Sequence, residues 1–455
     1  MFLLLISFSY TVVSQEIKKP NVIIVITDDQ GYGDLACNGN PIIKTPALDK
    51  LYQQSIRLTD FHVSPTCAPS RSGLMTGRYA NRVGVWHTVG GLSILRKDEV
   101  TMANVFQNSG YETAMFGKWH LGDKEGRYPK DKGFDEWYGI PRTTNESMFF
   151  DAIGYDESIV EPPYVMEGIK GKPAEKKELY DLEMRRKIDA VLTERSCEFI
   201  KRNANKKPFF LYVPLTQLHF PTLPHRDFEG ISKQGDFADS LIEMDARVGQ
   251  IIDAIDQNHL TDNTVFIFAS DNGPEYRRPW RGSAGMWTGT YHTAMEGALR
   301  VPLIIRWPNK IPAGKVTNEM VHVVDLFPTL AQIANLETPK DRVIDGLDQS
   351  QFLLGKQEKS NREGFVYFIK TELRAAKWRD WKMHFVWEVE PNAGANHLET
   401  PYLFNIVQDP KEESDVNTTQ GWVRGPIRKM VINFQNSLKE HPPIPPGAPD
   451  EFQPK

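Results

Sequence analysis

Cysteine is scarce in this chain, whose 455 residues contain only Cys37, Cys67 and Cys197. This scarcity excludes a disulfide-dense framework, and an odd count leaves at least one thiol outside any bridge. We expect Cys37 and Cys197 to be small core residues, although a bridge between them stays open. Cys67 stands in a more informative context, which is described below.

The chain also lacks an excess of positive charge. It has 54 Lys and Arg residues against 59 Asp and Glu residues, which gives a formal net charge of -5. Nucleic acids and anionic membranes bind to basic surfaces, so neither is an expected partner. An anionic small molecule is not excluded, because a metal ion or a few cationic side chains can gather positive charge locally.

Long apolar runs are missing except at the N-terminus. Residues 1–15, MFLLLISFSYTVVSQ, are apolar and precede a polar segment. This run is too short for a membrane-spanning helix but fits the apolar region of a secretory signal peptide. Because the usual basic residues before it are missing, a packed N-terminal strand is the alternative. We predict a signal peptide, a secreted, periplasmic or secretory-pathway location, and no stable membrane insertion.

Runs of β-branched residues alternate with helical patterns over most of the chain. Strands are expected at residues 21–27, 208–214, 264–270 and 301–306, and helices at 45–54, 102–109, 182–203, 236–258 and 324–335. This alternation predicts a large mixed, mostly parallel sheet sandwiched by helices. Ligands of such sheets bind beyond the carboxyl ends of the strands. Polar residues follow three of the expected strands, at Asp28-Asp29, His219 and Asp271-Asn272.

The pattern changes near residue 360. Short β runs at 364–369, 381–388 and 402–406 predict a smaller antiparallel sheet, closed by a helix at 424–438. We therefore expect a catalytic domain over residues 18–360, a C-terminal α+β subdomain over 361–440 and a proline-rich tail over 441–455. Residues 139–177 show no clear periodicity and are expected to form a long loop over the site.

The segment from Cys67 reads Cys-Ala-Pro-Ser-Arg-Ser-Gly-Leu-Met-Thr-Gly. Pro69 and Ser70 are suited to opening a helix, which would place Cys67 at its N-terminal end, where free amides favour negative charge. Arg71 adds a fixed cation within one turn. By spacing alone, a buried structural cysteine before an ordinary helix is equally compatible.

The motif Cys67-x-Pro69-Ser70-Arg71, with Thr76-Gly77, resembles the signature of the formylglycine-dependent sulfatases of the alkaline phosphatase superfamily. The resemblance extends from about residue 20 to about residue 415. Further segments resemble the family in the same order: Thr27-Asp28-Asp29, Gly117 to Gly122, His219-Phe220-Pro221, Ser270 to Gly273, Glu296 to Pro302, and Leu403 to Ile406 with Asp409-Pro410. The resemblance implies an alkaline phosphatase-like fold.

The resemblance also implies a mechanism for hydrolysing sulfate monoesters, either aryl or carbohydrate sulfates. A formylglycine-generating enzyme would oxidise Cys67, and one hydroxyl of the aldehyde hydrate would attack sulfur to form a covalent enzyme–sulfate intermediate. Lys118 would bind a sulfate oxygen, and Arg71 would add a cation. His219 would protonate the leaving alcohol, and His120 would act as the base that releases inorganic sulfate.

Four side chains form an all-oxygen set that suits one Ca²⁺ ion, with position 67 completing the shell. These are Asp28, Asp29, Asp271 and Asn272. Taken singly, the first pair could be a polar strand end and the second pair a turn. Their joint occurrence with Cys67 favours the metal site. We expect Lys118 and His120, two apart on an extended segment, to face the same way.

One position departs from the family pattern. Many members carry a second sulfate-binding lysine five residues before the Glu-Gly pair, and this position here is Tyr291. His292, or an arginine among Arg277, Arg278 and Arg281, would supply the missing cation. Trp280, Arg281, Tyr291 and His292 are therefore candidate substrate-binding residues, although this aromatic and basic region is equally compatible with a solvated loop.

Two other functions stay open. A phosphonate monoester or phosphodiester hydrolase of the same superfamily would use the same aldehyde and metal, and relative turnover of aryl sulfate and aryl phosphodiester separates the two activities. A non-catalytic binder of sulfated glycans would keep Cys67 as a thiol. Such a binder would be expected to lose metal or base residues, which this chain retains.

Overall fold

The computed structural model describes residues 19–87, 94–279, 281–391, 393–445 and 447–449. The expected signal peptide, Trp280 and the end of the proline-rich tail lie outside the described residues. No helix in the described part of the chain has the length and apolar character needed to cross a bilayer.

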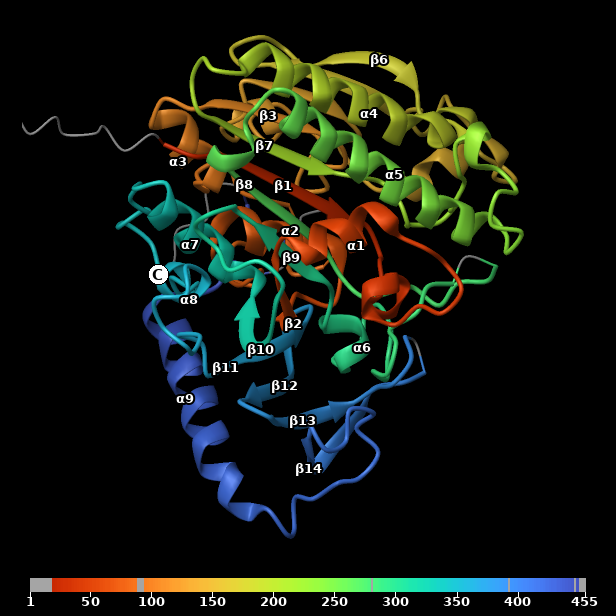
Figure 1. Ribbon diagram of the computed structural model, residues 1–455. Helices are drawn as coiled ribbons and strands as arrows, with labels where there is room; N and C mark the ends of the chain where they lie inside the picture. Colours follow the sequence, from red (N-terminus) through yellow and green to blue (C-terminus); the bar gives the residue numbers. More distant parts are fainter. Residues whose placement is uncertain (1–18, 88–93, 280, 392, 446, 450–455) are drawn as a thin grey trace, which may run out of the picture.

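Within this part of the chain, the strands form one large and one small sheet. They are β1 (Asn21–Thr27), β2 (Ile56–His62), β3 (Glu112–Phe116), β4 (Glu136–Gly139), β5 (Tyr164–Ile169), β6 (Glu175–Leu179), β7 (Phe209–Pro214), β8 (Thr264–Ser270), β9 (Leu303–Arg306), β10 (Lys315–His322), β11 (Gly364–Ile369), β12 (Glu372–Trp378), β13 (Trp381–Trp387) and β14 (Asn396–Asn405). The large sheet has the order β10-β2-β9-β8-β1-β7-β3-β4-β5-β6, and the small sheet has the order β11-β12-β13-β14 (Figure 1).

The large sheet is mixed and mostly parallel, as the sequence predicts. Its central strand β1 is parallel to β7 and β8, whereas β9 runs antiparallel to β2 and β8. The small sheet is antiparallel throughout. The predicted fold class is therefore confirmed.

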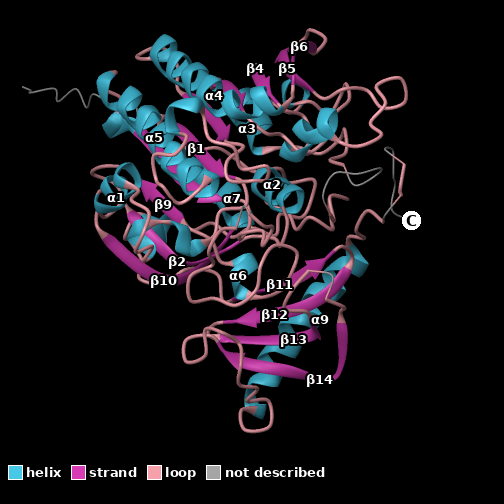
Figure 2. Ribbon diagram, turned by 90° about the vertical axis from the view of Figure 1, so that its right-hand side faces the viewer, coloured by secondary structure: helices cyan, strands magenta, loops and turns pink. Residues whose placement is uncertain are grey.

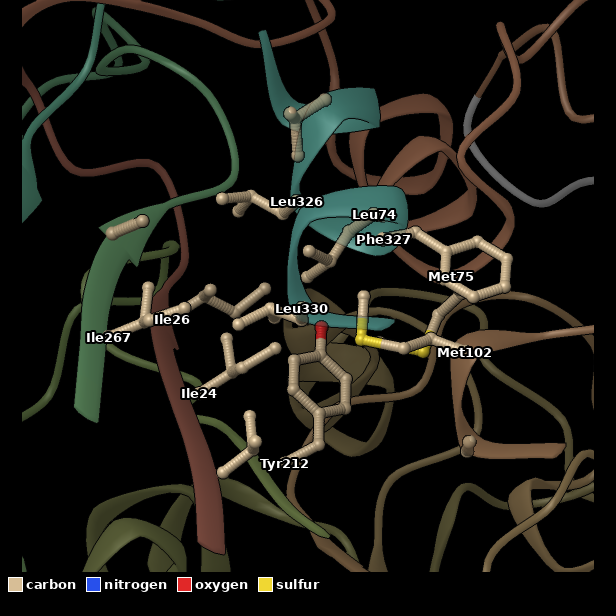
Figure 3. Close-up of a cluster of buried hydrophobic side chains, with 14 of the residues drawn as sticks. Ile24, Ile26, Leu74, Met75, Met102, Tyr212, Ile267, Leu326, Phe327 and Leu330 are labelled. Carbon is tan, nitrogen blue, oxygen red and sulfur yellow. The ribbon is translucent and has the colours of Figure 1, made fainter. Parts of the chain in front are cut away.

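Helices cover both faces of the large sheet (Figure 2). The helices of the described residues are α1 (Pro46–Gln53), α2 (Cys67–Thr76), α3 (Met102–Asn108), α4 (Leu182–Asn203), α5 (Asp236–Gln257), α6 (Glu296–Leu299), α7 (Leu326–Ile333), α8 (Ser350–Leu353) and α9 (Arg424–Glu440). Of these, α9 packs on the small sheet. Ile24 and Ile26 of β1 pack with α2, α3 and α7, in the cluster drawn in Figure 3. Ile23 and Val25 pack with α4 and α5 on the other face. Because helices cover both faces of the sheet, the residues of β1 form a nearly continuous apolar run in the sequence.

The prediction of one long loop over residues 139–177 is wrong. This region contains the 3-10 helix η4 (Thr144–Asp151), and β5 and β6 extend the sheet as antiparallel edge strands. All five residues of β6 are exposed, and its sequence is Glu-Lys-Lys-Glu-Leu. Such a charged edge strand lacks the apolar alternation by which strands are recognised, and charges of this kind protect an edge against further pairing.

A cluster of buried charges joins the large sheet to the small one. It contains three carboxylates, three cations and two histidines, which we call the interface charge cluster: Asp60, Glu296, Glu412, Arg300, Lys377, Lys382, His62 and His384. Lys382 Nζ lies 3.0 Å from Glu296 Oε1, and Lys377 Nζ lies 2.6 Å from Asp60 Oδ1. The formal charges of the three acids and three cations cancel while both histidines are neutral. Buried charges are tolerated only when they are paired in this way.

His62 should make stability sensitive to acid. Burial and the nearby Lys377 lower its pKa to about 4, although Asp60 and Glu296 oppose the shift. The folded pKa lies below the unfolded value near 6.5, so the unfolded chain takes up this proton first as the pH falls from 7 to 4. We expect this linkage to lower the free energy of unfolding by up to about 3 kcal/mol. Denaturant unfolding of wild type and His62→Gln at several pH values measures the loss.

The variant should lose less stability over this pH range than the wild type. His397→Gln is the matched control, because it removes an imidazole that lies on β14 of the small sheet and is 69% exposed. Parallel pH profiles for wild type and His62→Gln would contradict the assignment.

Candidate active site

The polar ends of three adjacent strands meet at one edge of the large sheet. Asp28 and Asp29 follow β1, while Asp271 and Asn272 follow β8, its parallel neighbour, in which Ser270 pairs with Thr27. His219 comes shortly after β7, which lies on the other side of β1. The carboxyl edge of the sheet therefore brings these side chains together, as the sequence predicts.

Cys67 is the first residue of α2, in agreement with the expected helix start. All ten residues of α2 are buried, and Gly77 ends the helix in the left-handed conformation that glycine favours. Cys67 Sγ lies 3.8 Å from Asp29 Oδ1. Cys67 Sγ and one carboxylate oxygen each of Asp28, Asp29 and Asp271 lie within 4.8 Å of one another. Burial raises the pKa of the Cys67 thiol well above its ordinary value.

Two buried cations hold the acids in place. The Nε of Arg71 donates to Asp271 Oδ2 at 2.9 Å, and Lys118 Nζ donates to Asp28 Oδ2 at 2.7 Å. Burial alone would raise the pKa of Asp28, but Lys118, His219 and Arg71 outweigh it and hold this pKa well below its usual range. Asp28 is therefore a fixed carboxylate.

The other two acids have raised, rather than lowered, pKa values. Burial, together with Asp28, Glu275 and Asp271, raises the pKa of Asp29 well above its ordinary value. Burial likewise raises the pKa of Asp271 to about 7, although Arg71 opposes it. Arg71 and Lys118 therefore do not fully stabilise Asp29 and Asp271 as anions, and a bound cation would favour the charged form of both acids.

The donor set fits a hard cation. Among the described residues, the buried oxygens Asp29 Oδ2 and Asn272 Oδ1 have no hydrogen-bond partner. The amide of Asn272 donates to the other oxygen of Asp29 at 2.6 Å, which orients both side chains. Unpartnered buried oxygens are costly, and carboxylate and amide oxygens are the ligands that hard cations prefer.

The two histidines occupy different positions. Nδ1 of His219 lies 2.7 Å from the Phe220 carbonyl, which can only accept, so Nδ1 carries the proton and Nε2 is the unprotonated nitrogen. His219 Nε2 lies 3.8 Å from Asp29 Oδ2. Burial and Lys118 lower the pKa of His219 to about 3 and that of His120 well below its ordinary value. Both imidazoles are therefore neutral near pH 7 in this structure.

Lys118 and His120 do not lie on an extended strand, so that expectation is wrong. β3 ends at Phe116, and His120 has a left-handed φ of 58°. The backbone amides of the two residues donate to Pro214 and Pro141 respectively, which fixes an irregular segment beyond the strand. Alternation over two residues predicts facing side chains only within a strand.

Contacts made by three further residues were not expected from the sequence. The hydroxyl of Thr144, in η4, donates to Asp28 Oδ2 at 3.0 Å, and Thr143 Oγ1 lies 3.4 Å from His219 Nε2. Arg185 of α4 donates to the carbonyl oxygens of His219 and Pro221. Only the general location of residues 143–150 near the site could be inferred beforehand, because no sequence period marks these residues.

The candidate substrate-binding residues are partly brought to the site. Tyr291 is close enough to Cys67 and Asp29 for their charges to act on it, and burial raises its pKa well above its ordinary value. His292 stacks on His87 with ring centroids 4.9 Å apart, and burial, Lys370 and Arg374 lower its pKa. Arg281 lies over the ring of Tyr276 at 3.9 Å.

Comparison with known proteins identifies the family. The family model described as Sulfatase matches residues 20–336 of this chain. The chain belongs to the sulfatase family. It is accordingly a sulfuric ester hydrolase, and the family resemblance predicted from the motif at Cys67 is confirmed. A second model, for the C-terminal part of N-sulphoglucosamine sulphohydrolase, matches residues 291–422.

Curated relatives of this sulfatase span nearly its whole length. It is 30% identical to the steryl-sulfatase of Homo sapiens, over 99% of this chain and 92% of that protein. It is also 30% identical to the N-acetylgalactosamine-6-sulfatase of Sus scrofa, over 95% of this chain and 88% of that protein.

Solved structures show the same fold. The PsFucS1 sulfatase from Pseudoalteromonas sp. superposes with a TM-score of 0.87 at 30% identity, over 94% of this sulfatase and 92% of that chain. The phosphonate monoester hydrolase of Agrobacterium radiobacter superposes with a TM-score of 0.59 at 20% identity, covering 93% of this chain and 96% of that one, a likeness of fold alone.

Proposed function

We propose that this sulfatase hydrolyses sulfate monoesters, aryl or carbohydrate, with Cys67 as the nucleophilic position after its oxidation to formylglycine. The observation that carries the proposal is the position of Cys67 at the buried start of α2, with its Sγ grouped with oxygens of Asp28, Asp29 and Asp271. The aldehyde hydrate would supply an attacking oxygen and a second hydroxyl, which allows sulfate to leave. A formylglycine-generating enzyme would be the partner during maturation.

The surrounding side chains have matching roles in the proposal. Lys118 binds a sulfate oxygen, and Arg71 holds Asp28 and Asp271 in position. His219 delivers a proton from Nε2 to the leaving oxygen, and the anionic substrate raises its pKa on binding. His120, neutral and buried, accepts the proton that accompanies sulfate release.

Asp28, Asp29, Asp271 and Asn272 would hold one Ca²⁺ ion, together with position 67. Bound there, the cation would stabilise negative charge on the nucleophile and on the sulfate oxygens. The unpartnered oxygens of Asp29 and Asn272 support this assignment.

We favour a sulfated glycan as the substrate, so that the leaving group is a sugar hydroxyl. The neighbouring structures include one titled as a complex with k-i-k-neocarrahexaose and one with D-glucosamine-2-N,6-O-disulfate. Tyr291 and His292 offer aromatic and basic contacts close to Cys67. Arg281 and Trp280, which precede them in the sequence, are further candidates for contact with the substrate. We further propose that residues 1–15 direct secretion, that residues 18–360 form the catalytic domain and that residues 361–440 form the C-terminal subdomain.

The proposal is tested first on the peptide that contains position 67. Protein co-expressed with a formylglycine-generating enzyme is digested with trypsin, and the mass of peptide Leu58–Arg71 is measured. We expect the mass of formylglycine, together with calcium-dependent turnover of 4-nitrophenyl sulfate that exceeds turnover of bis(4-nitrophenyl) phosphate by at least about tenfold. An unmodified cysteine in active protein would refute the nucleophile, and a preference for the phosphodiester would favour the alternative hydrolase.

A further inference from the structure

A groove opens on the side of the small sheet that faces away from the active site. It is a cavity of about 650 Å³ between the first turns of α9 and the paired ends of β11 and β12. Phe365 and Tyr367 of β11 pack on α6, next to the Tyr291 loop. Val366, on the opposite face of the same strand, packs with Ile427 of α9. The groove therefore lies on the face of the small sheet that packs against α9, opposite to the face that packs against α6.

Three tryptophans gather at this end of the sheet. Trp378, which lines the groove, pairs with Trp381 across the two-residue turn between β12 and β13. Trp422, in the 3-10 helix η8 (Gly421–Val423), makes edge contacts with both rings, at centroid distances of 6.2 and 5.8 Å. Trp422 is nevertheless 61% exposed. A large ring that is held by its neighbours and open to solvent is typical of a binding surface, where one face stacks on a ligand.

The first turn of α9 keeps the groove open. Gly425 lines it, and a Cβ atom added at Gly425 would meet no heavy atom within 4 Å. Alanine would favour the helix over glycine by about 1 kcal/mol, so the packing of this chain does not require glycine here. The bare backbone leaves room for a ligand beside Trp378.

The charges along the groove leave a cation available to an anionic ligand. Glu363 also lines the groove, but its carboxylate accepts from Arg379 at 2.6 Å. Lys429 lines it and is exposed, as is the neighbouring Arg428, and the first turn of α9 contains no acidic residue. Within the described residues, the side chains of Lys429 and Asn433 make no hydrogen bond or ion pair. One cation and one amide are thus free to bind a partner, on a protein whose formal net charge is -5.

We propose that this groove is a second glycan-binding site, which holds a strand of a sulfated polysaccharide apart from the active site. The apolar C–H faces of the sugars stack on Trp422 and Trp378, a sulfate group pairs with Lys429, and Asn433 hydrogen-bonds to hydroxyl groups. A polymer held here raises the effective concentration of its sulfate esters at the active site. The choice of a sulfated polymer rests in part on the proposed function.

The test is native electrophoresis of the full chain, carrying Cys67→Ala to prevent turnover. The gels contain chondroitin sulfate, heparin, fucoidan or ι-carrageenan, with unsulfated dextran as the neutral gel. We expect at least one sulfated polymer to retard the protein more than dextran does. Trp422→Ala, Lys429→Gln and Gly425→Leu should each weaken the apparent affinity by at least about fivefold. Lys439→Gln, which makes the same charge change at the other end of α9, should migrate like the parent.

The outcomes separate this site from the proposed function. The groove variants, made with Cys67 intact, should keep the parent kcat/KM on 4-nitrophenyl sulfate, which cannot reach the groove and the active site together. If retention persists in all three groove variants, or is lost only in Lys118→Met, the polymer binds in the active site. Either result refutes the groove as a glycan-binding site. If no sulfated gel retards the protein, the groove is likewise refuted as a glycan-binding site. Groove-dependent retention in a protein that hydrolyses no sulfate ester supports the groove and refutes the proposed function.

Discussion

Replacing Cys67 with alanine is expected to abolish sulfate ester turnover, with a loss of about 10⁴-fold or more. The reason is chemical, because alanine cannot be oxidised to an aldehyde and offers no attacking atom. The side chain is fully buried beside Asp29, and its loss removes only one sulfur atom from the packing. Folding should therefore survive, and the kcat/KM for 4-nitrophenyl sulfate, together with the melting temperature, measures the two effects separately.

The serine variant makes the experiment sharper. Cys67→Ser keeps one hydroxyl but has no second one with which to expel sulfate. We expect the introduced hydroxyl to become sulfated without turning over, and a mass increase on the peptide of residues 58–71 detects this product. Cys197→Ala is the matched control, because Cys197 lies on α4, away from the site, and its loss should leave kcat/KM unchanged. Residual multiple turnover by Cys67→Ala would show that the nucleophile lies elsewhere.

Much of this site could be predicted from the sequence, because several of its side chains directly follow the ends of strands. Asp28 and Asp271 each follow a buried β-branched strand, and two parallel neighbours must end at the same edge of a sheet. The helix start at Cys67 is likewise encoded locally, by Pro69 within the helix and Gly77 at its end. In each case short-range chemistry determines where the side chain lies.

Other features depend on contacts that sequence patterns do not encode. Thr144 reaches Asp28 from a 3-10 helix that has no clear periodicity, and His120 adopts a left-handed conformation after β3. The interface charge cluster joins Glu296 to Lys382, which is 86 residues away along the chain. Such pairings arise from the docking of the small sheet on the large one, so hydrophobic patterns along the chain could not reveal them.

The proposed Ca²⁺ site predicts that chelation of the ion inactivates this sulfatase and exposes the unusual protonation of its acids. After treatment with EGTA, we expect activity below about 1% of the starting value and a melting temperature lowered by several degrees. Added Ca²⁺ should restore both quantities. Activity falls because the cation that stabilises the nucleophile is gone, and stability falls because Arg71 and Lys118 alone do not hold Asp29 and Asp271 as carboxylates.

Calcium binding should also release protons, and this readout does not depend on activity. Without the ion, burial raises the pKa of Asp271 to about 7, so this carboxyl group holds a proton near pH 6. Burial also raises the pKa of Asp29 well above its ordinary value. A metal ligand must be deprotonated, so binding at pH 6 to 7 should release about one to two protons. The affinity for Ca²⁺ should accordingly increase as the pH rises from 6 to 8, steeply below the pKa of Asp271 and less steeply above it.

Calorimetric titration in two buffers with different protonation enthalpies counts these protons. Asp271→Asn should weaken calcium binding by about 100-fold or more and remove the share of proton release that belongs to this carboxyl group. Asp245→Asn is the matched control: burial raises the pKa of Asp245 to about 6 as well, but its carboxylate accepts from the first amides of α1, away from the metal ligands. Calcium affinity that stays constant from pH 6 to 8, with no proton release, would refute a site built from protonated acids, because neutral Asp29 and Asp271 cannot bind the ion without losing their protons.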